Sequence, residues 1–216
     1  MALVKLNNKA VSNATAFGSI TSLGSMTFIK KLTASSSATL SFVDGTSDVV
    51  LDDTYKEYMF TFNNIHPGTE GTEFGFNMSV DSGSNYNVAK TTTFFYAYHY
   101  EDDSGGGNPA GLSYHGGGDL AQGTGFQQLA TDQGADNDAC LAGILHLFNP
   151  SSTTFVKHFI AQTSEYYLSD GAYANSRSNP NYIAGYGNTT SAVNAIRFQM
   201  SSGNIDAGDI CLYGIA

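Results

Sequence analysis

The sequence predicts an all-β protein, a jelly-roll-like β-sandwich preceded by an N-terminal arm of small residues. Three observations lead to this fold class. Apolar and polar residues alternate with period two in many short segments, the pattern of half-buried strands. Clusters of Gly, Asn, Asp and Ser separate these segments at short intervals, as turns do in sandwiches and barrels. The chain has 24 Gly, 13 Tyr and 14 Phe, and only 13% of its residues are charged, which is unlike a helical bundle.

The length of 216 residues suits one β domain that buries a core without disulfide bonds. Residues 1–25 are small and polar, so they cannot form a core of their own. We therefore expect two parts. Residues 1–25 form an N-terminal docking arm, and residues 26–216 form the β-sandwich domain.

About nine or ten strands are expected after the arm. A regular pattern lies at residues 55–64, where Tyr58, Phe60 and Phe62 share one face and Glu57, Met59 and Thr61 share the other. The strands are expected at residues 26–32, 39–43, 55–64, 73–80, 92–100, 140–148, 154–163, 182–186, 195–200 and 210–215, and a brief further strand is expected at 112–114 inside a long loop.

Two of these strands are rich in aromatic residues. Residues 73–80 place Phe74, Phe76, Met78 and Val80 on one face, listed here in chain order. Residues 92–100 carry aromatic side chains on both faces. A strand that is apolar on both faces lies at the centre of a sandwich or at a contact between subunits.

The second half of the chain contains more loop. Residues 101–118 form a long Gly-rich loop with one short strand, and residues 132–138 form an acidic loop. Residues 125–129 are expected to form one helical turn. Residues 169–181 are expected to be a polar loop before the last strands.

The C-terminal stretch predicts strand, turn, strand. Ile196, Phe198 and Met200 alternate with polar or small residues, and turn residues follow at 201–204 and 206–208. The chain ends one residue after the final strand, so the C-terminus is tied into a sheet. We expect this last hairpin to close the two-sheet domain.

Charge and hydropathy exclude several classes of partner. The formal net charge is −10, with nine Lys and Arg against nineteen Asp and Glu, and no basic stripe is present. Nucleic-acid binding is therefore not expected. No apolar run reaches the roughly 18 residues of a membrane helix, so membrane insertion is not expected. The N-terminus lacks the apolar segment of a secretion signal, which predicts synthesis in a cytoplasm.

Several short motifs resemble catalytic ones without their required context. The stretch DSGG at 103–106 matches some serine-protease nucleophiles, but only His99 lies nearby and no oxyanion architecture is visible. The stretch HGGG at 115–118 matches a lipase oxyanion hole, but the Gly-x-Ser-x-Gly elbow is missing. The sequence therefore predicts no enzyme, no catalytic residues and no cofactor.

The sequence gives little indication of a metal site or a disulfide bond. No two of the five histidines have zinc-type spacing with a third ligand nearby, although His146 and His158 lie in neighbouring expected strands and could face each other. The acidic loops 101–103 and 132–138 lack EF-hand spacing, so a structural divalent ion is left open. Cys140 and Cys211 are interpreted as small buried hydrophobic residues, and their pairing is also left open.

Three further blocks of the sequence are distinctive: YKEYMFTFNNIHP at 55–67, NPSSTTFVKHF at 149–159 and SSGNIDAGDICLYGI at 201–215. They resemble blocks in structural proteins of tailed marine bacteriophages, cyanophages among them. The first block is fairly specific, and the last is shared by many phage appendage and surface proteins. The resemblance implies a virion component without catalysis. It does not distinguish a tail fibre, a head fibre and a capsid decoration protein.

The expected function is a non-enzymatic module on the outside of a virion. It assembles as a homo-oligomer, with a trimer favoured, and with other virion proteins. The alternative is a receptor- or glycan-binding adhesin module that uses loops at one end of the sandwich to bind a host surface glycan. The candidate assembly or ligand-contact residues are Val11, Phe17, Tyr96, Tyr98, Tyr100, Tyr114, Tyr167 and Tyr173.

Overall fold

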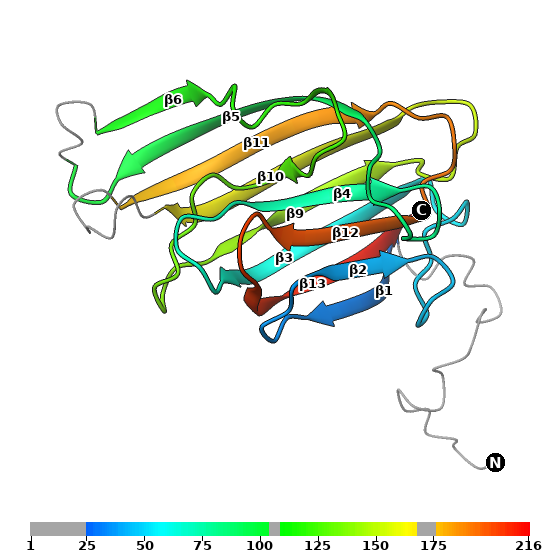
Figure 1. The fold of residues 1–216 in the computed structure, drawn as a ribbon, viewed down its shortest axis with the longest axis horizontal. Helices are drawn as coiled ribbons and strands as arrows, with labels where there is room; N and C mark the ends of the chain where they lie inside the picture. The colour runs from blue at the N-terminus through cyan, green and yellow to red at the C-terminus, as the bar shows by residue number, and fades with distance from the viewer. Residues whose placement is uncertain (1–24, 104–108, 168–175) are drawn as a thin grey trace, which may run out of the picture.

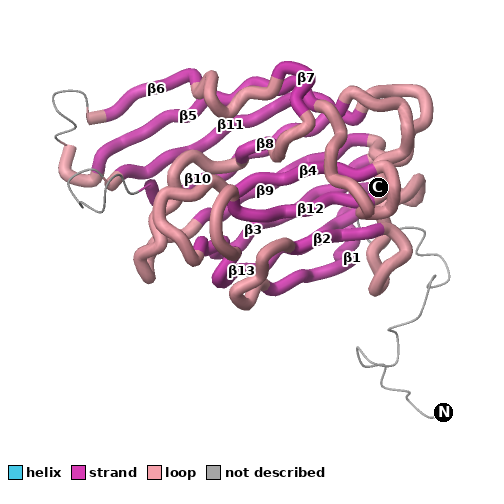
Figure 2. The backbone as a smooth tube through the Cα atoms, in the orientation of Figure 1, coloured by secondary structure: helices cyan, strands magenta, loops and turns pink. Residues whose placement is uncertain are grey.

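The computed structural model describes residues 25–103, 109–167 and 176–216, and within these ranges the chain is all β with no helix (Figure 2). Two antiparallel sheets pack face to face as a β-sandwich (Figure 1). The large sheet runs in the order β1 (Met26–Thr33), β13 (Ile205–Ile215), β3 (Glu57–Pro67), β9 (Leu141–Phe148), β10 (Lys157–Tyr167), β11 (Arg177–Gly187), β5 (Lys90–Tyr100) and β6 (Ala110–Tyr114), and β7 (Ala121–Gly123) also pairs with β5. The small sheet runs in the order β2 (Leu40–Val43), β12 (Ala195–Met200), β4 (Phe74–Ser79) and β8 (Gln127–Gln128).

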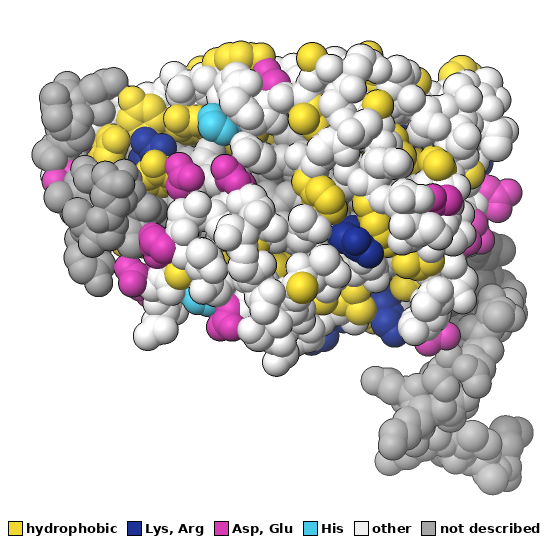
Figure 3. All heavy atoms as spheres, viewed as in Figure 1, with side chains coloured by type: hydrophobic (Ala, Val, Ile, Leu, Met, Phe, Trp, Pro, Cys, Tyr) yellow, Lys and Arg dark blue, Asp and Glu magenta, His cyan; other side chains and the backbone are white. Residues whose placement is uncertain are grey.

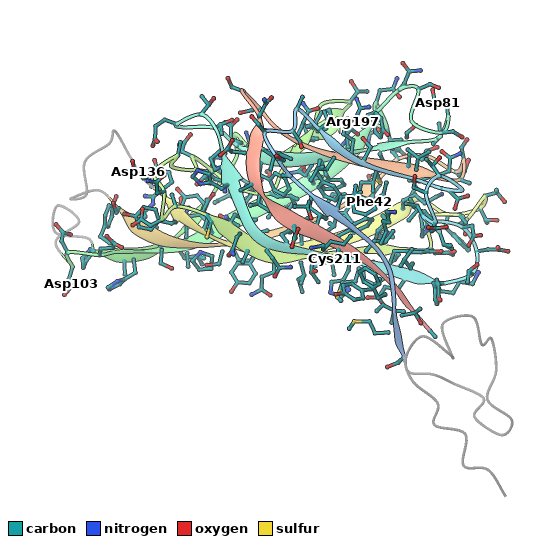
Figure 4. All side chains as sticks on the ribbon, turned by 90° about the horizontal axis from the view of Figure 1, so that it is seen from below. Phe42, Asp81, Asp103, Asp136, Arg197 and Cys211 are labelled. Carbon is teal, nitrogen blue, oxygen red and sulfur yellow. The ribbon has the colours of Figure 1, made fainter. Side chains whose placement is uncertain are left out.

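The core lies between the sheets and is built mainly from phenylalanine. Figure 4 shows the two layers edge-on, with Phe42 between them and Cys211 on the large sheet. Phe198 of β12 lies at the centre of the core, with ring centroids of its neighbours 5.4 to 6.3 Å away. Those neighbours are Phe42, Phe60, Phe62, Phe74 and Phe76. Mutual edge-to-face contacts add specific geometry to the burial of these rings.

The strand predictions are largely confirmed. The strand expected at 55–64 corresponds to β3, which begins two residues later and runs on to Pro67, and its Tyr58, Phe60 and Phe62 are buried as the alternation requires. The predictions for β4 and β5 also match, except that Val80 lies beyond the end of β4 and is exposed. β5 is not central in its sheet, since β6 alone lies beyond it on the main path.

The prediction of a closing hairpin was wrong. β12 belongs to the small sheet and β13 to the large sheet, so the chain crosses between layers there. The crossing at 201–204 is tied to the segment before β4: Ser202 N donates to Thr72 Oγ1 over 3.0 Å, and the two hydroxyls of Thr72 and Ser201 are 2.9 Å apart. Turn residues alone cannot distinguish a hairpin from such a crossing, because both need the same local backbone.

The predicted turn at 206–208 was also wrong, since β13 already begins at Ile205. These residues form register shifts against β3, on either side of Ala207. Gly208 has a φ of 118°, and a Cβ there would lie 2.5 Å from the carbonyl oxygen of Asn64. Glycine is therefore used for a bulge and a close backbone approach, rather than for a turn.

Two further predictions in the second half fail. Residues 125–129 form no helical turn, because β8 pairs there with Gly75 and Phe76 of β4. The expected polar loop 169–181 is strand from Arg177 onward, and β11 runs unbroken to Gly187. Its inner face is polar near the start, which hid the strand from a search for apolar alternation.

Candidate ligand-binding site: the Arg177 cluster

Four tyrosines and one arginine gather on the inner face of the large sheet, where the small sheet does not cover it. We call Tyr96, Tyr98, Tyr100, Tyr167 and Arg177 the Arg177 cluster. β5 brings three of the tyrosines to one face because they alternate along the strand, and register pairs Arg177 with Tyr100 and with Tyr167 on either side. Figure 1 shows the ends of β5 and β11 extending past the small sheet on this side.

The guanidinium group of Arg177 is surrounded by aromatic rings. Its central carbon lies 3.9 Å from the ring centroid of Tyr167 and 5.1 to 5.7 Å from the ring centroids of the other three tyrosines. Its Nη1 also donates to the Tyr100 hydroxyl over 3.4 Å. Cation–π contacts of this kind hold a charge in a partly apolar setting. In the space-filling view, hydrophobic side chains surround a basic one at this end of the molecule (Figure 3).

A glycine on the edge strand makes room for the cluster. A Cβ on Gly111 of β6 would lie 2.8 Å from the hydroxyl oxygen of Tyr98 and 3.0 Å from its ring carbon Cζ. The Tyr98 ring therefore lies directly over the backbone of β6. The cluster is a built feature of three neighbouring strands and not a chance meeting of loops.

Beside the cluster, two residues further along the inner face of β10 and β11, lies a buried polar network centred on Glu165 of β10. Its carboxylate accepts hydrogen bonds from the backbone N and the hydroxyl of Thr131, at 2.9 and 2.6 Å, and from the amides of Asn181 and Asn179, at 3.1 and 3.3 Å. Burial raises the pKa of Glu165, and these donors oppose the shift. The carbonyl oxygens of both asparagines are buried with no hydrogen-bond partner among the described residues.

The remaining predicted contact residues are not part of this cluster. Tyr114 pairs with Phe95 on the opposite face of the sheet and is exposed, and its hydroxyl bonds to the carboxylate of Asp119, which raises the Tyr114 pKa. Val11, Phe17 and Tyr173 lie outside the described residues, as does the arm at 1–24. Sequence analysis missed Arg177, because it falls in a stretch predicted to be loop.

The histidines considered as catalytic or metal-binding residues have other partners in the structure. His99 Nε2 and Asp103 Oδ1 lie 3.5 Å apart, and both side chains are exposed. His146 and His158 share the outer face of β9 and β10, but register pairs His146 with Ile160, and His146 bonds to Glu57 over 2.5 Å.

Both cysteines are free; Cys211 is buried and Cys140 is half-buried. In the ranges 25–103, 109–167 and 176–216, no three His, Cys, Asp or Glu side chains lie together as metal ligands would.

Comparison with known proteins gives no assignment: no protein-family model, curated protein or solved structure matches this chain. Within the described ranges, no helix is long and apolar enough to cross a membrane.

Proposed function

We propose that this chain is a non-enzymatic structural protein of a tailed-phage particle, a jelly-roll-like exterior module of the tail-fibre, head-fibre or capsid-decoration type. It is made in the host cytoplasm and resides in the virion. It assembles with other virion proteins and with its own copies, for which the sequence favours a trimer. The arm at 1–25 is the proposed docking segment, and neither nucleic acid nor membrane is a proposed partner.

The position of the resembling blocks supports this proposal. The blocks at 55–67 and 201–215 contain β3 and β13, which pair along nearly their whole length in the large sheet. Their apolar residues, among them Phe60, Phe62, Ile210 and Leu212, are buried. The resemblance therefore rests on the packed scaffold, which is the part of a fold that constrains sequence most.

The proposal of assembly depends mainly on one observation: the outward face of the large sheet is a broad surface rich in aromatic and aliphatic residues. Ile160, Leu112 and Tyr114 on this face are more than half exposed. Faces of this composition mark surfaces that bind other protein.

The test is the protein content of the virus that encodes this chain. Particles purified by density gradient should contain the chain in many copies when their proteins are quantified by mass spectrometry. Particles that lack the chain, while the infected lysate contains it, would contradict the proposal.

A second candidate function is glycan binding at the Arg177 cluster, so that the virion module is also an adhesin. Tyrosine rings stack against the apolar faces of sugars, and a guanidinium donates to their hydroxyl or carboxylate oxygens. The cluster is favoured over Tyr114 because it combines four rings with a donor on one surface.

The assembled protein should bind host cells or components of a glycan array. Tyr98→Ala and Arg177→Met should each weaken that binding about tenfold or more, which corresponds to roughly 1.4 kcal/mol. Val80→Ala, at an exposed position beyond the small-sheet strand β4, is the control and should bind as the wild type does. Failure of the assembled wild-type protein to bind any host surface would eliminate this second function.

A further inference from the structure

The charged residues of five neighbouring strands all lie on one face of the large sheet. β9, β10, β11, β5 and β6 contain four charged residues in total: Lys90, Lys157, Glu165 and Arg177. The first three are at most 3% exposed, and Arg177 lies among the inner-face tyrosines. The outward face of these strands therefore carries no Asp, Glu, Lys or Arg. Most soluble proteins show the reverse arrangement.

Aromatic and aliphatic side chains take the place of charges on this face. The rings of Phe95 and Tyr182 stack with centroids 5.2 Å apart and planes 12° from parallel. A groove of about 510 Å³ crosses the strands nearby, and Phe148, Ile160 and Tyr186 are among the residues that line it. The composition matches the core of a protein interface, where aromatic residues are enriched and charges are depleted.

Several charged residues lie at the boundary of the uncharged face, among them Glu101, which lines a groove with Ala142 and Ser164, and Asp119, which is bonded to Tyr114. Two others also have partners. Glu57 of β3 is bonded to His146 on one side. Asp103, beyond the end of β5, is 3.5 Å from His99. A protein that docks on the face need not break an internal ion pair in its centre.

The net charge of the chain indicates which partner suits the uncharged face. Each copy has a formal charge of −10, so two copies repel one another wherever their acidic surfaces meet. The outward face of β9, β10, β11, β5 and β6 offers a contact without that cost, and its best electrostatic match is the same uncharged face on another copy. A contact between identical faces is isologous and has a two-fold axis.

The outward face of these five strands is also large enough for a stable dimer interface. Five strands about 4.8 Å apart, with about eight residues each at 3.3 Å per residue, cover roughly 24 Å by 26 Å, on the order of 600 Å² before side-chain relief is added. Stable interfaces bury about 800 Å² per partner. The two values are comparable.

We propose that the outward face of β9, β10, β11, β5 and β6 is the surface through which one copy of this chain binds a second copy, as a two-fold dimer. The inference rests on the assembly part of the proposed function and names its partner and surface. It replaces the three-fold symmetry favoured by the sequence with a two-fold contact. A larger assembly in the virion would then be built from these dimers.

Sedimentation velocity across a range of concentrations tests the proposal on the full chain. The wild type should be a dimer. Ile160→Glu and Ile160→Lys should both raise the dimer dissociation constant at least about tenfold, because either variant places an unpaired charge in a contact that otherwise contains none. Their opposite signs separate this local effect from the general repulsion of an acidic protein. Val80→Glu, at an exposed apolar position beyond the small-sheet strand β4, is the control and should dimerise as the wild type does.

Thermal unfolding followed by circular dichroism confirms that each variant is folded. A wild type that is monomeric at every concentration, or an oligomer whose dissociation is unchanged in both folded Ile160 variants, would overturn the proposal. Either result leaves the virion proposal standing if purified particles contain the chain. Particles without the chain would refute the virion proposal but not a dimer measured in solution.

Discussion

At the scale of single residues, the most unusual groups are the buried ionisable side chains of the large sheet. Lys90 is fully buried, and its Nζ donates to Asn77 Oδ1 over 2.5 Å and to the carbonyl oxygen of Val88 over 2.8 Å. Its partners are neutral oxygens, so burial lowers the pKa of Lys90 to about 7. Register places Lys90 and the equally buried Lys157 on either side of Gly187.

This lysine predicts a specific dependence of stability on pH. Between the folded pKa of about 7 and the unfolded value of 10.5, the unfolded chain holds a proton that the folded chain has released. The free energy of unfolding should therefore rise with pH in this window, by up to about 1.4 kcal/mol per pH unit. Below pH 7 both states are protonated and the burial cost is fully present.

Lys90→Met should reduce that rise, as measured by urea unfolding at a series of pH values from 6 to 10; Lys157, whose pKa burial also lowers, still contributes. The exposed lysine at position 56 supplies the control, since Lys56→Met should keep the wild-type slope. Equal slopes in the wild type and Lys90→Met would refute the role assigned to Lys90.

Glu165 gives a second prediction, in which the free energy of unfolding falls as pH rises. Because its folded pKa is raised, it contributes stability that is present below its unfolded value and is lost as pH rises through the folded value. Glu165→Gln keeps an oxygen for the Thr131 and asparagine donors and removes the buried charge. The variant should unfold at higher urea than the wild type at pH 8, and the difference should shrink toward pH 4.

The control for this comparison is Glu101→Gln, which changes an exposed carboxylate. A Glu165→Gln variant that is less stable than the wild type at pH 8 would show that the ionised carboxylate is worth more than its burial costs.

At the scale of elements, close packing between neighbouring strands fixes certain glycines. A Cβ on Gly185 of β11 would lie 2.5 Å from the carbonyl oxygen of Thr91 and 2.9 Å from Thr92 Cα. Both are backbone atoms of β5, so neither can move without disturbing the ladder that joins the strands. β11 and β5 therefore depend on the absence of a side chain at this position.

Gly185→Ala should lower the free energy of unfolding by about 1–3 kcal/mol, the usual cost of overpacking. The matched control is Gly125→Ala, because a Cβ there meets nothing within 4 Å. Its effect should stay within about 0.5 kcal/mol. Urea unfolding at one pH measures both variants, and equal effects would contradict the packing argument.

At the scale of the whole molecule, the two faces of the large sheet differ in how much of them is covered. Four short strands cover part of one face of a nine-stranded sheet, whereas Leu112, Tyr114 and Ile160 on the outward face are more than half exposed. If copies associate through that face, binding stabilises the folded state by mass action. The melting temperature should then rise with protein concentration in the wild type.

Differential scanning calorimetry at several concentrations measures this effect. In Ile160→Glu the melting temperature should be lower and should no longer depend on concentration. A wild-type melting temperature that is independent of concentration would count against association of folded copies.

The sequence determined most of the strands and the buried face of several. Alternation is a local property, so Phe60 and Phe62, or Phe74 and Phe76, identify their inner face without knowledge of the partner strand. It also brought Tyr96, Tyr98 and Tyr100 to one face, as β5 shows. Prediction from sequence failed at 201–208, because the same turn residues can form a hairpin, a crossing between sheets or a bulge within a strand.

Only the tertiary structure decided which sheet each strand joins and what its inner face meets. β12 and β13 are neighbours in the chain but lie in different layers, because sheet membership depends on pairing with distant strands. Arg177 meets Tyr96 and Tyr167 only through the register of three strands. Only the pairing of β9, β10, β11, β5 and β6 side by side joins their outward positions into one surface without charged residues.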